Sequence, residues 1–360
     1  MGEVQSMMTL IPHLSSPLKP YRSIELFAGA GGMALGMERA GIEHILLNDF
    51  DRYAAATLKR NRPYWNVIHG DIANLDFNMY RGRVDLLTGG FPCQAFSYAG
   101  KKRGLEDTRG TLFYEFARAL KETSPKIFLA ENVKGLLNHD KGRTLKTIVE
   151  VFESMGYSVL PPRVLKALDY QVPQKRERVF IVGIKKRYAS KVSFAWPQPS
   201  SKHYTLKDAL KGGTLFSCDV PESPGQQYPE KKKRVLDLVP PGGYWRDLPL
   251  EMQKSYMMKS YYLGGGKTGI ARRISWDEPC LTLTCSPAQK QTERCHPEHT
   301  RPFTVREYAR IQTFPDEWIF EGSVTQQYKQ IGNAVPVNLA YALGCSLVDT
   351  LNQIERLSEK

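Results

Sequence analysis

Hydrophobic and polar positions form short blocks along the first half of the chain, and these blocks are typical of strands and helices that follow one another. Apolar runs predict strands at 23–29, 44–50, 66–72, 84–90, 125–133 and 178–184. Amphipathic segments predict helices at 32–41, 52–61, 111–124 and 143–156. This alternation indicates an α/β fold with a doubly wound, mostly parallel sheet.

The pattern changes near residue 187. Residues 187–300 are rich in Pro, Gly and Ser and have little helical period, which predicts a second, smaller domain of short strands and loops. A helical pattern returns at 304–314 and 334–355. We therefore expect an N-terminal extension, an α/β domain, an irregular domain, and a C-terminal segment that returns to the α/β domain, over residues 1–20, 21–186, 187–300 and 301–360.

Composition indicates which kind of partner the protein binds and in which cellular compartment it works. The formal net charge is +13 and the pI is about 9.3, which favours a polyanion, with nucleic acid first and an anionic membrane second. The chain shows neither a run of 18 apolar residues nor a signal-peptide pattern, so we expect no membrane span. Six irregularly spaced cysteines form no disulfide framework and indicate a reducing cytosol.

A glycine-rich turn follows the first predicted strand. Gly29 and Gly31 in "FAGAGGMALG", with Ala34 in the third position, fit the dinucleotide fingerprint, although a plain strand–helix turn would look the same. Asp49 closes the second strand and can hold ribose hydroxyls, and Phe50 offers a flat face to an adenine ring. Asp71 closes the third strand and can accept from an adenine amino group. A nicotinamide or flavin nucleotide would fit this crevice equally well.

Cys93 in "GFPCQAFS" follows the fourth strand at the same edge of the sheet. An isolated cysteine is usually an inert core thiol. The stiff Phe91-Pro92 approach and the long basic loop after Cys93 favour a nucleophile instead. Glu131 ends the fifth strand, where it could also be a helix N-terminal acid. Arg176 and Arg178 in "QKRER" alternate on a predicted strand and so share one face, unless that face is a solvated edge.

Six motifs occur in order: "FAGAGG", "GFPCQAFS", "ENVKG", "QKRER", "TVREYARIQTFP" and "IGNAVPVN". Together they resemble the ordered motif set of the cytosine-5 DNA methyltransferases, over about residues 22–186 and 268–350. The resemblance implies a methyltransferase with a Rossmann-like fold that transfers a methyl group from S-adenosylmethionine to carbon 5 of cytosine and releases S-adenosylhomocysteine. It makes residues 21–186 the catalytic and cofactor-binding domain and residues 187–300 the target recognition domain.

The resemblance also implies a role for each site residue. Cys93 would add to carbon 6 of the base, and Glu131 would hold N3 and the exocyclic amine. Arg176 and Arg178 would position the base. Phe27 would stack on the adenine of the cofactor. The other cofactor contacts would be Gly29, Gly31, Asp49, Phe50, Asp71, Ile72, Pro92, Leu112, Asn333 and Val335.

The target cytosine must leave the duplex to react, so we expect base flipping. The length and charge of loop 96–110 predict a lid that closes over DNA. We expect DNA contacts from Gln94, just before this loop, and from Ser97, Lys101 and Arg109 within it. Thr282, in a Thr-Leu pair typical of the family's recognition domain, would face a phosphate. The Gly-rich stretch "YLGGGKTG" predicts a further DNA-facing loop.

Five residues near the end of the irregular domain raise the question of a metal. Zinc is conceivable there, but the spacing fits no standard finger, so we expect no metal site. The residues are Cys280, Cys285, Cys295, His296 and His299.

We predict the modification enzyme of a bacterial restriction–modification system, which acts on double-stranded DNA, pairs functionally with an endonuclease, is monomeric, and works in the cytoplasm near the nucleoid. Three alternatives stay open. A tRNA methyltransferase of the same motif family would keep the chemistry, a catalytically inactive DNA-binding regulator would lose it, and an NAD-linked oxidoreductase would leave "PCQ" and "QKRER" unexplained.

Overall fold

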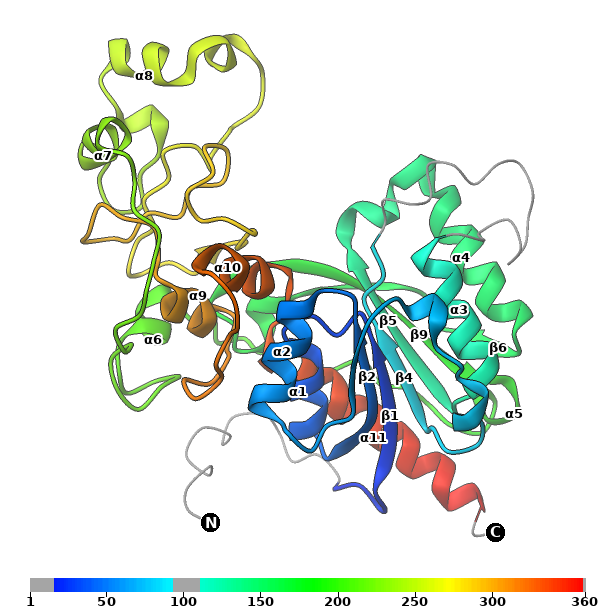
Figure 1. Ribbon diagram of the computed structural model, residues 1–360. Coiled ribbons are helices and arrows are strands. Elements are labelled where there is room, and N and C mark those ends of the chain that lie inside the picture. The colour runs from blue at the N-terminus through cyan, green and yellow to red at the C-terminus, as the bar shows by residue number, and fades with distance from the viewer. Residues whose placement is uncertain (1–15, 93–110, 359–360) are drawn as a thin grey trace. The chain divides into compact units, whose positions relative to one another are not determined.

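The computed structural model describes residues 16–92 and 111–358 (Figure 1). These residues form two compact units, each made of separate stretches of the chain. The unit that we call the sheet unit comprises described residues up to 166, together with 177–199 and 337–358. The unit that we call the inserted unit comprises 167–176 and 200–336. The predicted domain bounds, drawn from the sequence pattern, fall at other positions, and the predicted division stays a prediction.

An eight-stranded sheet forms the centre of the sheet unit, with the strand order β3-β2-β1-β4-β5-β9-β6 and β7 also paired to β9. β1 to β5 run parallel to one another, which confirms the predicted doubly wound, mostly parallel sheet. β9 runs antiparallel to β5, β6 and β7, a feature that the sequence pattern did not predict. The strands are β1 (Tyr21–Leu26), β2 (Ile42–Asp49), β3 (Val67–His69), β4 (Leu86–Gly89), β5 (Ile127–Val133), β6 (Tyr157–Val159), β7 (Arg163–Lys166) and β9 (Glu177–Lys185).

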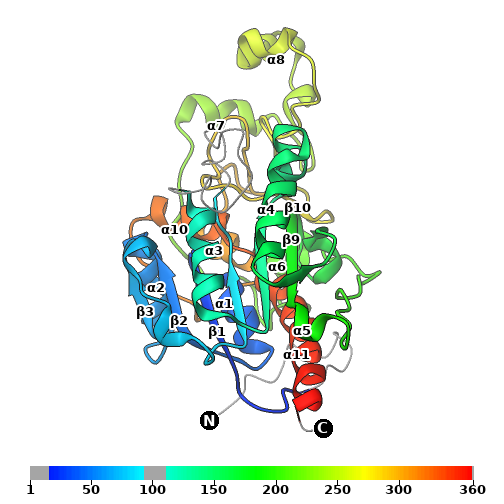
Figure 2. The ribbon, with the colours of Figure 1, turned by 90° about the vertical axis from the view of Figure 1, so that its right-hand side faces the viewer.

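Helices cover both faces of this sheet. They are α1 (Gly32–Arg39), α2 (Arg52–Asn61), α3 (Leu112–Thr123), α4 (Arg143–Ser154), α5 (Lys186–Ala189) and α11 (Val337–Ser358). α1 and α11 lie on one face and α3 and α4 on the other, as Figure 1 shows and the turned view of Figure 2 confirms. α2 has the predicted bounds because the Asp51 carboxylate accepts from the backbone N–H groups of Tyr53 and Ala54 and fixes its start.

α11 is a core helix. The helical run Val324–Ser358 is long and apolar enough to cross a membrane, but 83% of its most apolar window is buried within the protein. Close packing explains this burial, since a Cβ on Gly36 of α1 would lie 2.4 Å from the Cβ of Ala340. Glycine at position 36 therefore lets the two helices approach each other.

A cluster of phenylalanine rings fixes the end of β4. Phe91 packs edge-on against Phe113 at 5.3 Å between ring centroids and tilts against Phe116 at 5.7 Å. Both partners come from α3 and belong to the main core of the sheet unit. The chain that leads into residues 92 and 93 is thus anchored by the core.

The inserted unit is less regular but more helical than predicted. Its helices are α6 (Leu206–Leu210), α7 (Glu230–Asp237), α8 (Leu250–Met257), α9 (Val305–Ile311) and α10 (Val324–Asn333). Within its described residues, β8 (Gln174–Lys175) and β10 (Cys280–Leu281) form its two-stranded parallel sheet. A small apolar core around Trp245 packs Leu236, Met257 and Ile270.

Candidate active site

The glycine turn after β1 has the backbone that its sequence predicts. Phe27, Gly29 and Gly31 all have positive φ, at 56°, 56° and 86°. Gly31 is the N-cap of α1, so free N–H groups of the first turn face the end of the sheet. Glycine is suited to this turn because residues with a Cβ rarely adopt such angles.

Asp49, at the end of β2, ties the neighbouring strand end to this turn. Its Oδ2 accepts from the Gly29 N–H at 2.7 Å, and its Oδ1 accepts from the Asp51 N–H at 2.7 Å. The ring of Phe50 is 76% exposed. An open aromatic face therefore lies next in sequence to a carboxylate that is fixed by two backbone N–H groups.

One further acid and three apolar residues predicted for the site follow. Asp71 caps a short 3-10 turn through the Ala73 N–H at 3.0 Å, and the next residue, Ile72, is buried. Leu112 opens α3 with 37% of its surface exposed, and Pro92 is exposed. Cys93, Gln94, Ser97, Lys101 and Arg109 lie outside the described residues.

Glu131 and Arg178 form an ion pair in the sheet unit. The Arg178 Nε lies 3.1 Å from Glu131 Oε1, and both side chains are mostly buried. Burial lowers the pKa of Arg178, and the charge of Glu131 opposes that shift. A Cβ on Gly90 would lie 2.7 Å from Glu131 Oε2, so the glycine lets this carboxylate approach the backbone just before Phe91 and Pro92. The pair thus lies at the strand end that leads to Cys93.

Arg176 has different surroundings, and the prediction that it shares one strand face with Arg178 is wrong. Arg176 lies between β8 and β9, belongs to the inserted unit and is 1% exposed, which also rules out a solvated edge. Its Nη1 donates to the Leu283 carbonyl at 3.1 Å and its Nη2 to the Gly332 carbonyl at 2.9 Å. These bonds make Arg176 a support of the backbone.

Sequence reasoning missed two residues that support the site. Asn132 donates from Nδ2 to the Phe91 carbonyl at 2.7 Å and so holds the segment before Cys93. Glu25 in β1 is buried, and burial raises the pKa of its carboxyl to about 8. Thr88 donates to Glu25 at 3.3 Å. "ENV" and "IEL" contain these residues, but nothing in their local pattern separates them from ordinary strand residues.

Thr282, Asn333 and Val335 belong to the inserted unit. The Thr282 hydroxyl donates to the Lys175 carbonyl, and Arg294 donates to the Thr282 carbonyl at 2.7 Å. Asn333 ends α10 with an exposed side chain, and Val335 is buried.

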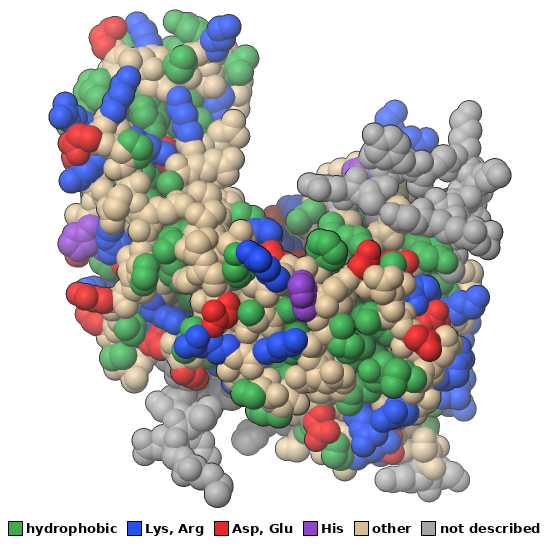
Figure 3. Space-filling model, in the orientation of Figure 1, with side chains coloured by type: hydrophobic (Ala, Val, Ile, Leu, Met, Phe, Trp, Pro, Cys, Tyr) green, Lys and Arg blue, Asp and Glu red, His purple; other side chains and the backbone are tan. Residues whose placement is uncertain are grey.

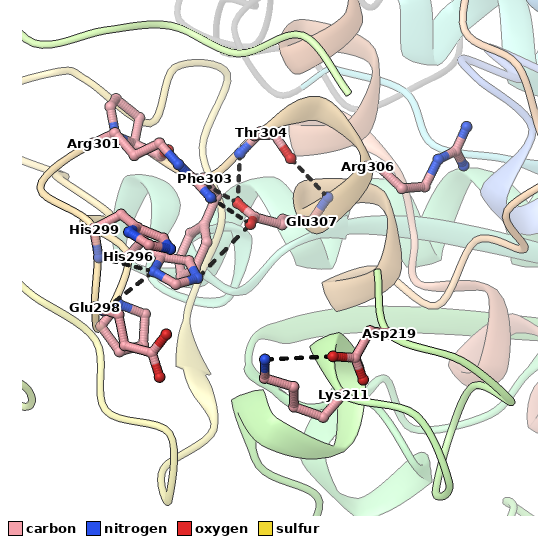
Figure 4. A network of polar contacts seen from close by, with 12 residues as sticks. Lys211, Asp219, His296, Glu298, His299, Arg301, Phe303, Thr304, Arg306 and Glu307 are labelled. Atoms are coloured by element: carbon pink, nitrogen blue, oxygen red, sulfur yellow. Dashed lines mark hydrogen bonds and ion pairs between the residues drawn. The ribbon is translucent and has the colours of Figure 1, made fainter. Parts of the chain in front are cut away.

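A pocket of about 330 Å³ in the inserted unit contains two of the cysteine and histidine residues considered for zinc, His296 and His299. Figure 4 shows Arg301 and Thr304 converging on Glu307, beside the two stacked imidazoles. Burial lowers the pKa of His296 to about 4. Lys211 and Asp219, which also line the pocket, pair with each other at 3.5 Å. Among the described residues, no His, Cys, Asp and Glu come together as a metal site.

A basic, partly apolar surface lies on the inserted unit around the end of α8. Residues 252–271 contain three lysines and no Asp or Glu. Met258, Tyr262 and Leu263 are 67%, 78% and 65% exposed. Figure 3 shows Lys, Arg and hydrophobic side chains at the surface of the part that carries α7 and α8. Such a surface favours a partner with negative charge and flat apolar faces.

Fold and site together define a nucleotide-dependent α/β enzyme with a cysteine segment, a buried acid–arginine pair and a basic inserted unit. Comparison with known proteins gives the family. Residues 21–349 match the family model described as C-5 cytosine-specific DNA methylase. The chain is 65% identical over 336 residues to the type II methyltransferase M.Eco47II of Escherichia coli, covering 93% of this chain and 81% of that protein.

Two further similarities agree with this result. The chain is 54% identical over 339 residues to the type II methyltransferase M.Sau96I of Staphylococcus aureus, covering 93% of this chain and 77% of that protein. The structure of the S. pombe Dnmt2 methyltransferase matches with a TM-score of 0.58 at 19% identity, covering 93% of this chain and 100% of that one, which shows the fold alone. The chain belongs to the C-5 cytosine-specific DNA methylase family, and it is a DNA cytosine-5 methyltransferase.

Proposed function

We propose that Glu131, Arg178 and Cys93 form the base-binding and catalytic centre of this methyltransferase. The observation that carries the proposal is the 3.1 Å Glu131–Arg178 pair, which lies against Gly90 at the strand end leading to Cys93. A flipped cytosine offers an acceptor at N3, a carbonyl at C2 and an exocyclic amine. A carboxyl and a guanidinium side by side match these groups with complementary donors and acceptors.

The residues at the sheet edge fit S-adenosylmethionine. The exposed Phe50 ring, the fixed carboxylate of Asp49 and the open space at Gly29 suit an adenosine, and we propose Phe27, Gly31, Asp71, Ile72, Pro92 and Leu112 as its other contacts in the sheet unit. When bound, the cofactor supplies the methyl group. Asn333 and Val335 belong to the inserted unit, and their contact with the cofactor rests on the family resemblance alone.

The chain's own residues prepare the base for this transfer. The Cys93 thiolate adds to carbon 6, which breaks the aromatic system and makes carbon 5 a nucleophile. Glu131 and Arg178 hold the base and stabilise the charge that this addition places on the ring. After methylation, the carbon-5 proton leaves as a proton to solvent, and the electron pair of the C–H bond re-forms the double bond while Cys93 departs as thiolate.

The inserted unit would read the DNA. Tyr262 and Leu263 are exposed on its basic, partly apolar surface, and Gly264 and Gly265 leave open space beside them. We include Thr282 as a phosphate contact, and Gln94, Ser97, Lys101 and Arg109 as contacts from the segment after Cys93. A monomer that works in the bacterial cytoplasm beside a cognate endonuclease completes the proposal, because the similar proteins above are type II methyltransferases.

Methyl uptake tests the proposal and its tRNA alternative together. The unaltered chain should incorporate labelled methyl groups from S-adenosylmethionine into duplex DNA and not into tRNA, and bisulfite sequencing should locate 5-methylcytosine at one repeated sequence. C93S should lose more than about a thousandfold in rate while it still binds DNA. Uptake by tRNA alone, or turnover by C93S near that of the unaltered chain, would contradict the proposal.

A further inference from the structure

A buried network of polar side chains joins four distant stretches of the inserted unit. Gln174, Arg176 and Gln312 are 0%, 1% and 0% exposed. The Gln174 Nε2 donates to Gln312 Oε1 at 2.8 Å. This bond links residues that are 138 positions apart, so it is a tertiary contact. Buried amides are costly unless they are hydrogen-bonded, so such a network strongly favours one arrangement of its partners.

One side of the network holds the segment that carries Thr282. The Leu283 N–H donates to Gln174 Oε1 at 2.9 Å, and Arg176 donates to the Leu283 carbonyl. Both backbone groups of the residue next to Thr282 are therefore fixed by the network. β8 and β10 add the pairing of Gln174 with Cys280 two residues earlier.

The other side holds the segment that carries Asn333. Arg176 donates to the carbonyl of Gly332, the residue before Asn333. The Gln312 Nε2 donates to the carbonyls of Ile331 at 2.8 Å and Ala334 at 3.1 Å, which flank it. The two segments also touch directly, because a Cβ on Gly332 would lie 2.2 Å from the Thr284 carbonyl oxygen.

We propose that Arg176 is a positioning residue, which sets the proposed DNA contact Thr282 and the proposed cofactor contact Asn333 relative to each other. Its guanidinium bonds one carbonyl beside each of them, so a shift of Arg176 moves both. The inference rests on the proposed function, since it takes the roles of Thr282 and Asn333 from there. It replaces the expected direct contact of Arg176 with the base.

Arg273 offers a matched control within the same unit. It is also a buried arginine, 4% exposed, and it donates to the backbone carbonyls of Val239 and Leu236, each at 2.7 Å. Neither carbonyl adjoins Thr282 or Asn333. R176K and R273K therefore make the same chemical change at two buried sites where an arginine holds carbonyls. Only the carbonyls that Arg176 holds lie next to Thr282 and Asn333.

The experiment measures the affinity of each purified variant for S-adenosylmethionine without DNA, its affinity for duplex DNA without cofactor, and its thermal midpoint. R176K should weaken both affinities by about tenfold, since small misplacements of contact groups cost that much. R273K, at a similar drop in midpoint, should keep the cofactor affinity within about twofold of the unaltered chain. G332A perturbs the same junction by crowding and should repeat the R176K result.

Equal cofactor affinities in R176K and R273K would overturn the proposal, and so would a loss confined to one ligand. If R176K and G332A both fail to fold while R273K folds, the network serves folding only and the proposal is likewise overturned. Failure of the proposed function would look different, because the unaltered chain itself would then transfer no methyl group to DNA.

Discussion

The two units bury different kinds of polar side chain. Among the described residues, the buried arginines are Arg176, Arg273, Arg294 and Arg310, and all four lie in the inserted unit. The sheet unit buries small polar groups such as Ser23, Asn48, Thr88 and Asn132. Glu25 is the only Asp, Glu, Lys, Arg or His that is buried in its described part.

The difference follows from how each unit satisfies its backbone. In the sheet unit, strand pairing satisfies most of the buried N–H and C=O groups, and side chains such as Asn48 and Asn132 hold further carbonyls beside the strands. The inserted unit has little strand pairing, so its loop carbonyls need other donors. Arginine has five N–H donors and can hold several carbonyls at once, as Arg310 does for Ala209, Cys218 and Asp219. Buried arginines can therefore hold a domain that consists mostly of loops in one conformation.

The largest effect should come from the acid of the sheet unit. E131Q keeps the shape of the side chain but replaces the charged partner of Arg178, and it should slow methyl transfer by about a hundredfold or more. E177Q is the matched control, since Glu177 pairs with Lys134 at 2.8 Å on a more exposed part of the unit. Single-turnover rates check this prediction, and a rate for E131Q close to that of E177Q would assign the base to another group.

Replacement of a buried arginine in the inserted unit should lower the free energy of unfolding more than replacement of a partly exposed arginine in the sheet unit. R310M strips donors from buried carbonyls and leaves Asp316 without its 2.9 Å partner, so it should lower the free energy of unfolding by about 3 kcal/mol. R118M is the counterpart in the sheet unit, where the partly exposed Arg118 pairs with Glu115 and Glu122 and donates to the carbonyls of Ile72 and Leu75. It should cost about 1.5 kcal/mol in denaturant unfolding, because water can reach the groups that it leaves. Equal losses would contradict the comparison.

Glu25 predicts a pH dependence of stability in the sheet unit. Burial raises the pKa of its carboxyl to about 8 from an ordinary value of 4.5, so between these values the unfolded chain releases a proton that the folded chain keeps. Stability from this group is full below pH 4.5 and is lost as pH rises toward 8. E25Q lacks this loss of stability. From pH 6 to pH 8, the thermal midpoint of the unaltered chain should therefore fall relative to that of E25Q. A constant difference would mean that Glu25 is ionised in the fold.

The smallest effect should be on DNA affinity. Y262A removes a tyrosine that is 78% exposed on the basic surface of the inserted unit, and it should weaken duplex binding by about fivefold, because one stacking or groove contact contributes about 1 kcal/mol. Y64A removes a tyrosine that is 75% exposed in the sheet unit, and it should leave binding unchanged. Titrations at two salt concentrations check both, and the loss in Y262A should persist at the higher salt because it is not a phosphate contact.

The sequence predicted what local patterns determine. The helix over 52–61 was predicted with its observed bounds because a capping aspartate precedes it, and six strands were placed because each is a short buried run. The antiparallel direction of β9 and the short strands β6 and β7 were missed, since pairing partners lie far apart in sequence. α10 was also missed, although Ser323 caps it through Gln326, because its sequence "VTQQYKQIGN" is polar and contains few apolar residues.

The candidate site likewise contains residues that local patterns predict and residues that they do not. The glycine turn and Asp49 follow from motif and position, and the structure places them together at one sheet edge. Arg176 and Arg178 look equivalent in "QKRER", yet one supports carbonyls of the inserted unit and the other pairs with Glu131. Tertiary partners 107 and 156 residues away decide this, and no local pattern contains them.

Covalent capture of the target base tests the central claim most directly. Duplex DNA in which 5-fluorocytosine replaces cytosine cannot lose a proton from carbon 5, so the adduct with Cys93 should persist once the methyl group is transferred. We expect a denaturation-resistant complex of the unaltered chain with this DNA in the presence of S-adenosylmethionine, and none with C93S. Free protein and free DNA after incubation of the unaltered chain, alongside normal methylation of ordinary DNA, would contradict the account.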